Sequence, residues 1–378
     1  MRVMHILESL DHGGLERVVT DLAIAQKRHG LDVSVLCLHR TEGYKAELLD
    51  HGLDVIVAEK CKPFDMRALR CIRRSVAERR VEVVHAHSFV PNYYAAAAMC
   101  GMSGRPTLVG TCHDMGTRLN NRRLNLFYGW SLRRTAGVAM VGRQVHDRFV
   151  GDGIVPAAKA TTVLNGIPVD RFLGSAERRA QARHALGLGA GERVIGAVGR
   201  MVALKNQRLL IELMPTLVAE HPSTRLVLIG SGPLEQELRH CARQLGVTDR
   251  VLFAGQRSNV ADLTPAFDVF AMPSLTEGVS IALLEACATG LAVVATRVGG
   301  NPEIVTDRET GLLVPPADGP ALHAALSRLL ADAELRRRLG EQAAAWVRSH
   351  ASVDTLRAAY DRFYAKAAGQ PLGAAQAA

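Results

Sequence analysis

The 378-residue sequence lacks the features that mark several large classes of protein. Its seven cysteines include no Cys-x-x-Cys pair and no histidine cluster at zinc spacing, so nothing indicates a zinc module or a disulfide framework. No apolar run is long enough to cross a bilayer, and residues 1–8 are too few and too polar for a signal peptide. Aromatic residues make up only 4% and are not interleaved with basic residues, which argues against nucleic acid as a partner. We therefore expect a cytoplasmic protein with reduced thiols.

Two ligand-binding motifs are also missing. The glycines near residues 13 and 230 do not follow the Gly-x-Gly-x-x-Gly spacing, which disfavours a dinucleotide-dependent oxidoreductase. No Asp-x-Asp occurs, so a metal bridging two phosphates through paired carboxylates is unsupported, and we expect neither a metal nor a cofactor. A bound phosphate would then have to be held by cationic side chains and helix ends.

Negative charge is scarce in one region. The net charge is +9, and residues 67–134 contain 12 Lys or Arg against 3 Asp or Glu, a local excess of +9. This arginine-rich region predicts a basic surface that binds an anionic membrane or a phosphorylated acceptor. A solvated basic face with no partner is the alternative.

Short β-branched runs alternate with longer helical patterns along the whole chain. The predicted strands are 2–7, 32–37, 54–57, 82–85, 107–110, 137–141, 193–198, 225–229, 250–253, 268–271, 292–295 and 312–314. The predicted helices between and after them are 14–29, 43–51, 66–79, 91–101, 121–134, 176–186, 205–220, 233–245, 258–264, 279–289, 319–330 and 333–347. This alternation predicts α/β domains, each with a doubly wound parallel sheet covered on both faces.

The length of the chain favours two such domains in tandem. Glycine and proline follow a strand run in residues 165–170, which predicts a first domain over 1–170 and a second over 171–351. A helix over 352–367 is expected to pack back on the first domain, and the Ala/Gly-rich tail 369–378 is expected to be disordered. Open parallel sheets bind ligands beyond the carboxyl ends of their strands, so we expect the two sheets to face a central cleft.

Two carboxylates near the C-terminus stand eight residues apart. Glu277 follows a strand in a loop, and Glu285 belongs to an apolar helix predicted to begin near Val279. The free N–H groups at the start of this helix, around Val279 and Ser280, suit a phosphate. Glu285 is expected about two turns into the helix on a buried segment, where a carboxylate needs a partner such as a sugar hydroxyl.

Two cations flank one loop of the second domain. Arg200 follows a strand and Lys205 opens the next helix, five residues later. Surface ion pairs would explain them, but a clamp on a diphosphate fits their position better. Gly232, in the loop after the next strand, has the permissive backbone that a nucleotide base or ribose would need nearby.

The first domain has its own polar loops at strand ends. Gly13 and Gly14 follow the first strand at the start of a helix, where backbone can approach a phosphate, although a tight turn would also explain them. His113 follows one strand, and His85 and His87 end another. Two histidine loops in one domain indicate a site without naming a reaction.

With these residues assembled, the chain resembles the retaining family-4 glycosyltransferases of the GT-B fold, which transfer sugars from nucleotide diphosphate donors. The resemblance covers nearly the whole chain. It rests on these matched elements: Gly13 and Gly14, the His113 loop, residues 165–170, Arg200 with Lys205, and residues 277–285 followed by Gly299, Gly300 and Glu303.

The resemblance implies a role for each matched residue. Arg200 and Lys205 would hold the donor diphosphate and stabilise charge on the departing phosphate, while Glu277 and His113 would face the transferred sugar. Glu285 would bind the ribose hydroxyls. The implied donor-binding set is Gly13, Gly14, Gly232, Arg257, Val279, Ser280 and Glu285, with Gly232 and Arg257 near the base.

The expected activity is a metal-independent hexosyl transfer with retention of configuration. The resemblance favours a UDP-sugar donor, with a GDP-sugar possible, and a lipid-linked or saccharide acceptor. It implies synthesis of a cell-surface polysaccharide, such as an exopolysaccharide, or of a glycolipid at the inner face of the plasma membrane. There the region 67–134 would make the protein peripheral to the membrane. The alternatives are a nucleotide-sugar epimerase or a phosphorylase of the same architecture, and a catalytically silent nucleotide-sugar-binding protein.

Overall fold

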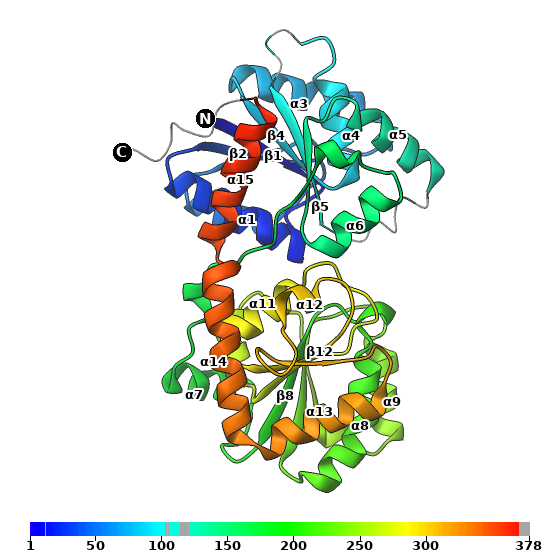
Figure 1. Cartoon of the computed structure of the whole chain (residues 1–378), viewed down its shortest axis with the longest axis vertical. Coiled ribbons are helices and arrows are strands. Elements are labelled where there is room, and N and C mark those ends of the chain that lie inside the picture. Colours follow the sequence, from blue (N-terminus) through cyan, green and yellow to red (C-terminus); the bar gives the residue numbers. More distant parts are fainter. Residues whose placement is uncertain (12, 103, 105, 114–118, 120, 370–378) are drawn as a thin grey trace. The chain divides into compact units, whose positions relative to one another are not determined.

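The computed structural model describes residues 1–11, 13–102, 104, 106–113, 119 and 121–369. The chain divides into two compact units, one formed by Met1–Gly166 with the C-terminal segment from Val353, the other by Ile167–Ser352 (Figure 1). Of the tail predicted to be disordered, residues 370–378 lie outside the described residues. No described helix combines the length and the apolar character that a membrane span requires.

The first unit is built on a parallel sheet with the strand order β3-β2-β1-β4-β5-β6-β7. Its strands are β1 (Arg2–Leu7), β2 (Asp32–Cys37), β3 (Asp54–Val57), β4 (Val83–His87), β5 (Thr107–Cys112), β6 (Gly137–Met140) and β7 (Ala160–Thr162). Because β1 pairs with β2 on one side and β4 on the other, the chain reverses its winding at this point. A crevice forms beyond the carboxyl ends of the strands at such a switch point.

Helices flank this sheet. They are α1 (Gly14–Arg28), α2 (Lys45–Asp50), α3 (Met66–Glu78), α4 (Phe89–Ala98), α5 (Arg122–Leu132), α6 (Arg143–Gly151) and α15 (Val353–Ala367). Helix α15 is the last of the described elements, yet it packs beside α1, which follows the first strand (Figure 1). The first unit therefore includes a helix that follows the whole second unit in the sequence.

The second unit repeats the architecture with the strand order β10-β9-β8-β11-β12-β13, again in parallel. Its strands are β8 (Arg193–Val198), β9 (Thr224–Ile229), β10 (Val251–Gly255), β11 (Val269–Met272), β12 (Ala292–Thr296) and β13 (Leu312–Val314). Its helices are α7 (Ala176–Ala185), α8 (Gln207–Glu220), α9 (Glu235–Gln244), α10 (Val260–Leu263), α11 (Ile281–Ala288), α12 (Asn301–Ile304), α13 (Gly319–Ala331) and α14 (Ala333–His350). Its switch point lies at β8, between β9 and β11.

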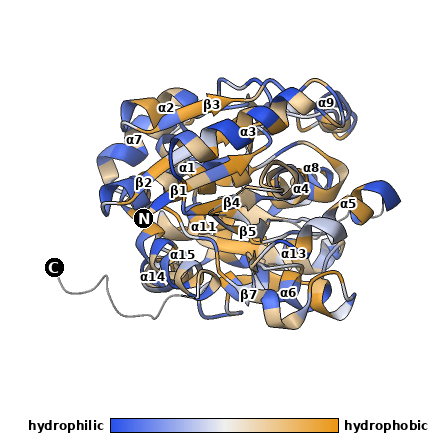
Figure 2. Cartoon of the chain, turned by 90° about the horizontal axis from the view of Figure 1, so that it is seen from above, coloured by the Kyte–Doolittle hydropathy of each residue, from blue (hydrophilic) through white to orange (hydrophobic). Residues whose placement is uncertain are grey.

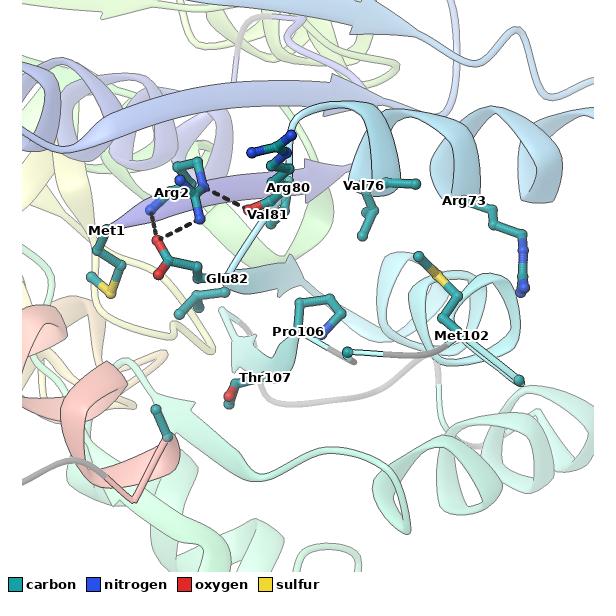
Figure 3. A pocket seen from close by; sticks show the side chains of 15 residues that line it. Met1, Arg2, Arg73, Val76, Arg80, Val81, Glu82, Met102, Pro106 and Thr107 are labelled. Carbon is teal, nitrogen blue, oxygen red and sulfur yellow. Dashed lines mark hydrogen bonds and ion pairs between the residues drawn. The ribbon is translucent and has the colours of Figure 1, made fainter.

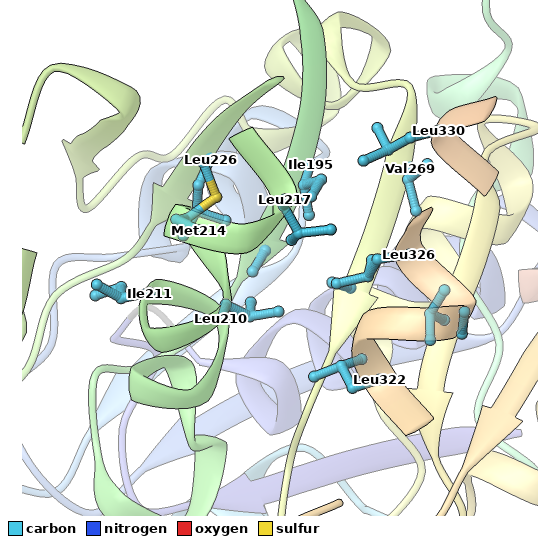
Figure 4. Packing of buried hydrophobic residues seen from close by; sticks show 14 of the residues in the cluster. Ile195, Leu210, Ile211, Met214, Leu217, Leu226, Val269, Leu322, Leu326 and Leu330 are labelled. Atoms are coloured by element: carbon cyan, nitrogen blue, oxygen red, sulfur yellow. The ribbon is translucent and has the colours of Figure 1, made fainter. Parts of the chain in front are cut away.

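Burial of apolar side chains holds each sheet to its helices. In the second unit, Ile195 and Leu226 of the sheet pack in one buried cluster with Leu210 of α8 and Leu326 of α13 (Figure 4). Each fully buried leucine or isoleucine contributes about 1.5–3 kcal/mol. In Figure 2 the strands are largely coloured as hydrophobic, whereas outer faces of helices such as α3 carry hydrophilic residues. Candidate functional side chains are therefore expected mainly at the strand ends and in the loops.

The predicted fold class, two doubly wound parallel-sheet α/β domains, is confirmed. The predicted strands agree with the observed ones to within a few residues at their ends. Two elements of the first unit had no counterpart in the predicted elements. Strand β7 is only three residues long and none of them is buried, and α6 buries only Val145 and Phe149, so neither has a strong apolar pattern.

Candidate functional site

The switch point of the second unit is bridged by an ion pair between two predicted site residues. Lys205 lies in the loop after β8, and Glu277 lies in the loop after β11. Lys205 Nζ is 2.6 Å from Glu277 Oε1, and the backbone N–H of Leu275 donates to the carbonyl of Leu204 at 2.8 Å. The two loops that flank the crevice are therefore joined by both side chains and backbone.

Glu277 is the more deeply buried partner of this pair. Its side chain is 8% exposed, against 26% for Lys205, and Ser274 Oγ donates a second hydrogen bond to Glu277 Oε1 at 2.6 Å. A buried carboxylate is tolerated when an opposite charge and hydrogen bonds compensate its lost hydration. Lys205 and Ser274 supply both, so the orientation of Glu277 is fixed before any ligand binds.

Arg200 is the contrasting cation of the same loop. Its side chain is exposed and, among the residues that the structure describes, makes no hydrogen bond or ion pair. Its backbone carbonyl accepts a hydrogen bond from Gln207 Nε2 at 2.9 Å, which anchors the start of the loop to α8. The loop thus presents one cation held by a carboxylate and one that projects toward solvent.

A glycine pair fixes the loop that contains Glu277. Gly299 and Gly300 follow β12, and Gly300 N–H donates to the carbonyl of Gly278 at 2.7 Å. Gly299 has φ +53, and a Cβ placed there would lie 1.9 Å from the carbonyl oxygen of Glu277. Only glycine allows this close approach. These two residues are therefore needed to position the loop.

Helix α11 begins later than predicted and places Glu285 differently. Ser280 is its N-cap, and Ser280 Oγ accepts a hydrogen bond from Leu283 N–H. Since the helix starts at Ile281, Glu285 lies about one turn into it rather than two, and it is half-buried rather than buried. Val279 and Ser280 are both buried directly before the first turn. The expectation that Glu285 is the buried carboxylate was wrong, and Glu277 is buried instead.

The two residues predicted near the base differ in how tightly they are held. A Cβ at Gly232 would lie 2.4 Å from the carbonyl oxygen of Met201, because the loops after β8 and β9 pack backbone against backbone. Packing alone thus explains this glycine. Arg257 follows β10, is exposed, and donates from Nε to the carbonyl of Ala254 at 2.8 Å.

At the switch point of the first unit, Gly14 begins α1 and Gly13 is its N-cap, as predicted. A Cβ at Gly13 would meet only the carboxylate of Glu16, at 2.2 Å. Burial, and beyond it the charges of Asp11 and Glu8, raises the pKa of Glu16. Carboxylates therefore already surround this helix start, and a phosphate that approaches it must displace Glu16.

His113 follows β5 at the same edge and is half-buried. Its Nε2 lies 3.0 Å from His87 Nδ1, at the end of β4, and burial lowers the pKa of His113 to about 3. The next residue after His87, Ser88, has φ +73, a strained value for a residue other than glycine. The two predicted histidine loops therefore meet at one place.

Two polar residues beneath this edge carried no signal in the sequence. His5, inside β1, and Gln26, inside α1, are fully buried and hydrogen-bonded to each other at 2.8 Å. His5 lies within an apolar run typical of ordinary core, and Gln26 directly precedes Lys27 and Arg28, where an exposed polar residue is expected. In the second unit Ser274 was equally hidden, because its role depends on contact with Glu277.

A hollow of about 910 Å³ lies at the opposite, amino edge of the first sheet (Figure 3). Arg2, Arg73 and Arg80 line it, but Arg2 Nε donates to the carbonyl of Arg80, and Arg73 donates to the carbonyls of Ala98 and Cys100. These contacts tie chain segments together. No predicted site residue lies there, so this hollow is not the candidate site.

Comparison with known proteins places the chain in a family. Residues 12–171 match the family model described as Glycosyltransferase Family 4, and residues 178–346 match Glycosyl transferases group 1. A GDP-mannose-dependent alpha-(1-6)-phosphatidylinositol monomannoside mannosyltransferase of Mycolicibacterium smegmatis is 32% identical over 300 residues, which cover 72% of this chain and 75% of that protein. N-acetyl-alpha-D-glucosaminyl L-malate synthase of Bacillus anthracis is 27% identical over 80% of this chain and 79% of that protein.

Solved structures show the same fold. HepE of Anabaena in complex with UDP-glucose superposes with a TM-score of 0.87 at 21% identity, covering 97% of this chain and all of that chain. The glycosyltransferase WaaG, involved in lipopolysaccharide biosynthesis, superposes with a TM-score of 0.75 at 20% identity, covering 96% and 99%. Two parallel-sheet units with this likeness define a glycosyltransferase of the GT-B fold. The chain belongs to the family 4 glycosyltransferases.

Proposed function

We propose that this glycosyltransferase moves a hexose from a nucleotide diphosphate donor with retention of configuration and without a metal ion. The observation that carries the proposal is the cation pair after β8, with Arg200 exposed and Lys205 held by Glu277. The departing diphosphate gains negative charge in the transition state, and preorganised cations at that point stabilise it. The absence of Asp-x-Asp from the sequence supports cations rather than a carboxylate-bound metal in this role.

The contacts of Glu277 support retention without a glycosyl-enzyme intermediate. Lys205 and Ser274 both donate hydrogen bonds to Oε1 of Glu277, and the positive charge of Lys205 offsets the charge of the carboxylate, which makes it a poor nucleophile. We therefore assign Glu277 to positioning the sugar and Lys205. His113 is proposed to contact the sugar because of the resemblance to the family. A phosphate oxygen of the donor would accept the proton of the attacking hydroxyl, so no protein base is required.

The remaining donor contacts follow from loops at the carboxyl edges. In the second unit Glu285 would bind the ribose, Gly232 and Arg257 would lie near the base, and Val279 and Ser280 would offer N–H groups to the diphosphate. Gly13 and Gly14 would do the same from the first unit once Glu16 has moved. The half-buried position of Glu285, one turn into α11, is compatible with a ligand that bonds its carboxylate.

Support for the donor is divided between two bases. The sequence analysis favours a UDP-sugar, and the HepE structures contain UDP or UDP-glucose, but that likeness is at 21% identity. Relatives at 31–32% identity are named as GDP-mannose-dependent. A panel containing GDP-mannose and several UDP-sugars, with free nucleotide release as the readout, identifies the donor. Binding of the correct donor also raises the melting temperature.

One variant tests the site in this assay. Arg200→Ala is expected to lower kcat/KM by roughly 100- to 1,000-fold. Because the Arg200 side chain has no partner among the described residues, the melting temperature of the Arg200→Ala protein should equal that of the unaltered protein. Unchanged turnover in Arg200→Ala would sink the proposal. Release of nucleotide without any acceptor would favour an epimerase, and turnover that survives EDTA supports independence from metal.

The acceptor is proposed to be lipid-linked or a saccharide, used in building a cell-surface polysaccharide or glycolipid at the inner face of the plasma membrane. Helix α5 supports peripheral binding to an anionic membrane there, because it exposes Leu126, Phe127 and Trp130. Arg134 lies over the Trp130 ring at 5.4 Å, and the surrounding region 67–134 is strongly basic. Apolar groups among cations are typical of a helix that lies in the membrane interface.

Flotation with vesicles tests this part separately. Vesicles containing phosphatidylglycerol should carry the protein at low salt, and vesicles of pure phosphatidylcholine should not. Leu126→Gln with Phe127→Gln should weaken flotation, while Leu245→Gln, an exposed leucine of the second unit, serves as the matched control. Flotation that ignores lipid charge would contradict the membrane proposal but leave the transferase proposal standing.

A further inference from the structure

A row of hydrogen-bonded side chains runs through the first unit from α1 to the carboxyl edge of the sheet. Gln26 Oε1 is 2.8 Å from His5 Nε2, and His5 Nδ1 is 2.9 Å from His87 Nε2. His87 Nδ1 is in turn 3.0 Å from His113 Nε2. Gln26, His5 and His87 are at most 1% exposed, so water does not compete for these bonds.

The register of the parallel sheet explains why these residues meet. His5 of β1 stands beside His85 of β4, and His87 lies two residues further along β4 on the same face. His87 stands beside Thr111 of β5, two residues before His113. The row therefore crosses three adjacent strands on the face that α1 and α15 cover.

The rings in the row point their nitrogens at one another. The centroids of His5 and His87 are 5.2 Å apart, close to the greatest separation that a 2.9 Å contact between ring nitrogens allows. The same holds for His87 and His113, at 5.3 Å for a 3.0 Å contact. These nitrogens therefore lie on the line between the rings, as in an N–H···N hydrogen bond.

This geometry also decides against a metal in the same place. Among the described residues, His5, His85 and His87 form a group whose ligand atoms are near enough to hold a metal ion. A metal requires lone pairs that converge on one point, whereas the lone pair between His5 and His87 is directed along their shared hydrogen bond. His85 uses both its nitrogens elsewhere, on Tyr364 and Thr111, each at 2.7 Å.

The rings are neutral, so each has one N–H and one lone pair. Burial lowers the pKa of His5 to about 4 and that of His113 to about 3, and burial together with the neighbouring histidines lowers the pKa of His87 well below its usual value. An amide oxygen only accepts. Gln26 Oε1 therefore requires the proton of His5 on Nε2, which leaves His5 Nδ1 to accept from His87.

The same reasoning gives the donor and the acceptor of the hydrogen bond between His87 and His113, at the edge of the sheet. His87 donates from Nε2, so its Nδ1 accepts from Nε2 of His113. His113 then has no proton on Nδ1, and within the part of the chain that the structure describes this nitrogen makes no hydrogen bond. One buried amide thus determines what a residue at the edge offers to a ligand.

The C-terminal helix supplies the second hydrogen-bond partner of this amide. Gln26 Nε2 donates to the hydroxyl oxygen of Tyr364 at 3.3 Å. The hydroxyl proton of Tyr364 then goes to His85 Nδ1, and His85 Nε2 donates to Thr111 Oγ1. A Gln26 amide turned over would reverse every donor in both branches and put the proton of His113 on Nδ1.

We propose that Gln26, through His5 and His87, fixes the tautomer of His113 so that Nδ1 presents a lone pair and accepts a hydrogen bond from a hydroxyl group of the substrate. Gln26, His5 and His87 are positioning residues in this arrangement, and His113 is the residue that touches substrate. The tautomer is a property of the protein alone. The hydroxyl contact rests on the proposed function.

Nitrogen NMR of the unaltered protein, labelled with ¹⁵N-histidine and measured without substrate, tests the tautomer. The signals of His113 are those that vanish in His113→Gln. The expected result is a protonated Nε2 and an unprotonated Nδ1 at neutral pH. A proton on Nδ1 of His113 would overturn the proposal.

Variants of the buried partners test the cause. Gln26→Glu keeps an accepting oxygen and should leave the tautomer of His113 unchanged, whereas Gln26→Met removes it and should give a mixture of tautomers. Tyr364→Phe removes the acceptor of Gln26 Nε2, so this variant should also contain some His113 with its proton on Nδ1. Tyr360→Phe, which loses only a bond to Thr111, is the matched control. An unchanged tautomer in Gln26→Met would also overturn the proposal.

Turnover separates the two parts of the inference. Turnover is measured with the donor that the panel identifies. Gln26→Met should lower kcat/KM about tenfold, which corresponds to the loss of one hydrogen bond. Gln26→Glu should keep kcat/KM close to that of the unaltered protein. A shifted tautomer with unchanged kcat/KM would overturn the hydroxyl contact. Absence of turnover in the unaltered protein would overturn the proposed function alone, because the nitrogen signals are recorded without substrate.

Discussion

The carboxyl edges of the two sheets have the same topology and opposite chemistry. At the second edge a charged pair, Lys205 and Glu277, bridges the switch point, with the exposed Arg200 on the same loop. At the first edge the side chains that meet are neutral histidines joined by hydrogen bonds. One architecture thus carries full charges at one edge and neutral hydrogen-bond partners at the other. The topology sets where chemistry occurs, and a few loop residues set its kind.

The largest expected effect comes from removing the ion pair at the charged edge. Lys205→Ala removes a proposed diphosphate contact and leaves Glu277 buried without its cation. We expect kcat/KM to fall by roughly 100- to 1,000-fold and stability to fall by about 3 kcal/mol. Urea unfolding and donor turnover measure the two effects.

A double variant separates charge from folding at this pair. Lys205→Met combined with Glu277→Gln replaces two charges by two neutral groups of similar size, so most of the lost stability should return. Activity should not return. A fully active double variant would mean that the charge of Lys205 is not used on the donor.

The second prediction compares two glycine loops, one at each edge. Gly299→Ala places a Cβ against the backbone oxygen of Glu277 at a positive φ, so we expect a loss of about 3 kcal/mol together with loss of donor binding. Gly13→Ala meets only the flexible end of Glu16 and should cost little stability. Thermal unfolding of the two variants checks the contrast, and equal losses would contradict it.

The third prediction concerns pH and the neutral edge. Burial lowers the pKa of His5 to about 4 and that of His113 to about 3, against 6.5 for an unperturbed histidine. Below pH 6.5 the unfolded chain therefore binds protons that the folded unit does not, and stability falls with pH until these folded pKa values are reached. At pH 5 each histidine accounts for about 2 kcal/mol relative to pH 7.

Tryptophan fluorescence isolates this effect. The chain has two tryptophans, so in Trp346→Phe only Trp130 of the first unit reports unfolding. The first unit should lose stability between pH 7 and pH 5, and His113→Gln should lose about 2 kcal/mol less over that interval. An identical pH dependence in His113→Gln would show that its ring is not held neutral by burial.

The smallest expected effect is that of Arg257→Ala, which tests an exposed residue of the second unit. Arg257 is exposed and its guanidinium bonds only to the carbonyl of Ala254 among described residues, so Arg257→Ala should change stability by less than about 0.5 kcal/mol. If Arg257 lies near the base, KM for the donor should rise while kcat stays constant. Unchanged KM would remove it from the donor site.

The predicted elements and loops were confirmed where they depended on local patterns. Alternating apolar runs gave the two sheets, and residues after strands, such as Arg200 and Glu277, lie at the carboxyl edges as expected. Burial was harder to predict. Glu285 stands in an apolar helix, which suggested that it is buried, but the helix starts later, and Glu285 lies on its less buried face with Ile281 and Ala282.

The buried polar network could not be predicted from the sequence. His5 is flanked by apolar residues and Gln26 stands between Ala25 and Lys27, and the role of both depends on the register of β1 against β4 and on the packing of α1. Tyr364 lies more than 300 positions away from both. Such long-range hydrogen bonds leave no periodic pattern, so only the three-dimensional arrangement reveals them.

The position of α15 in the first unit also has a consequence for synthesis of the protein. Tyr360 and Tyr364 supply hydroxyl groups to Thr111, Gln26 and His85, and α15 is synthesised only after the whole second unit. While the second unit is being made, the histidines of the first unit still lack these partners. A nascent chain that stops at residue 352 would therefore contain every strand of both sheets but only an incomplete first unit. The first unit can thus reach its full set of hydrogen bonds only after α15 has been synthesised.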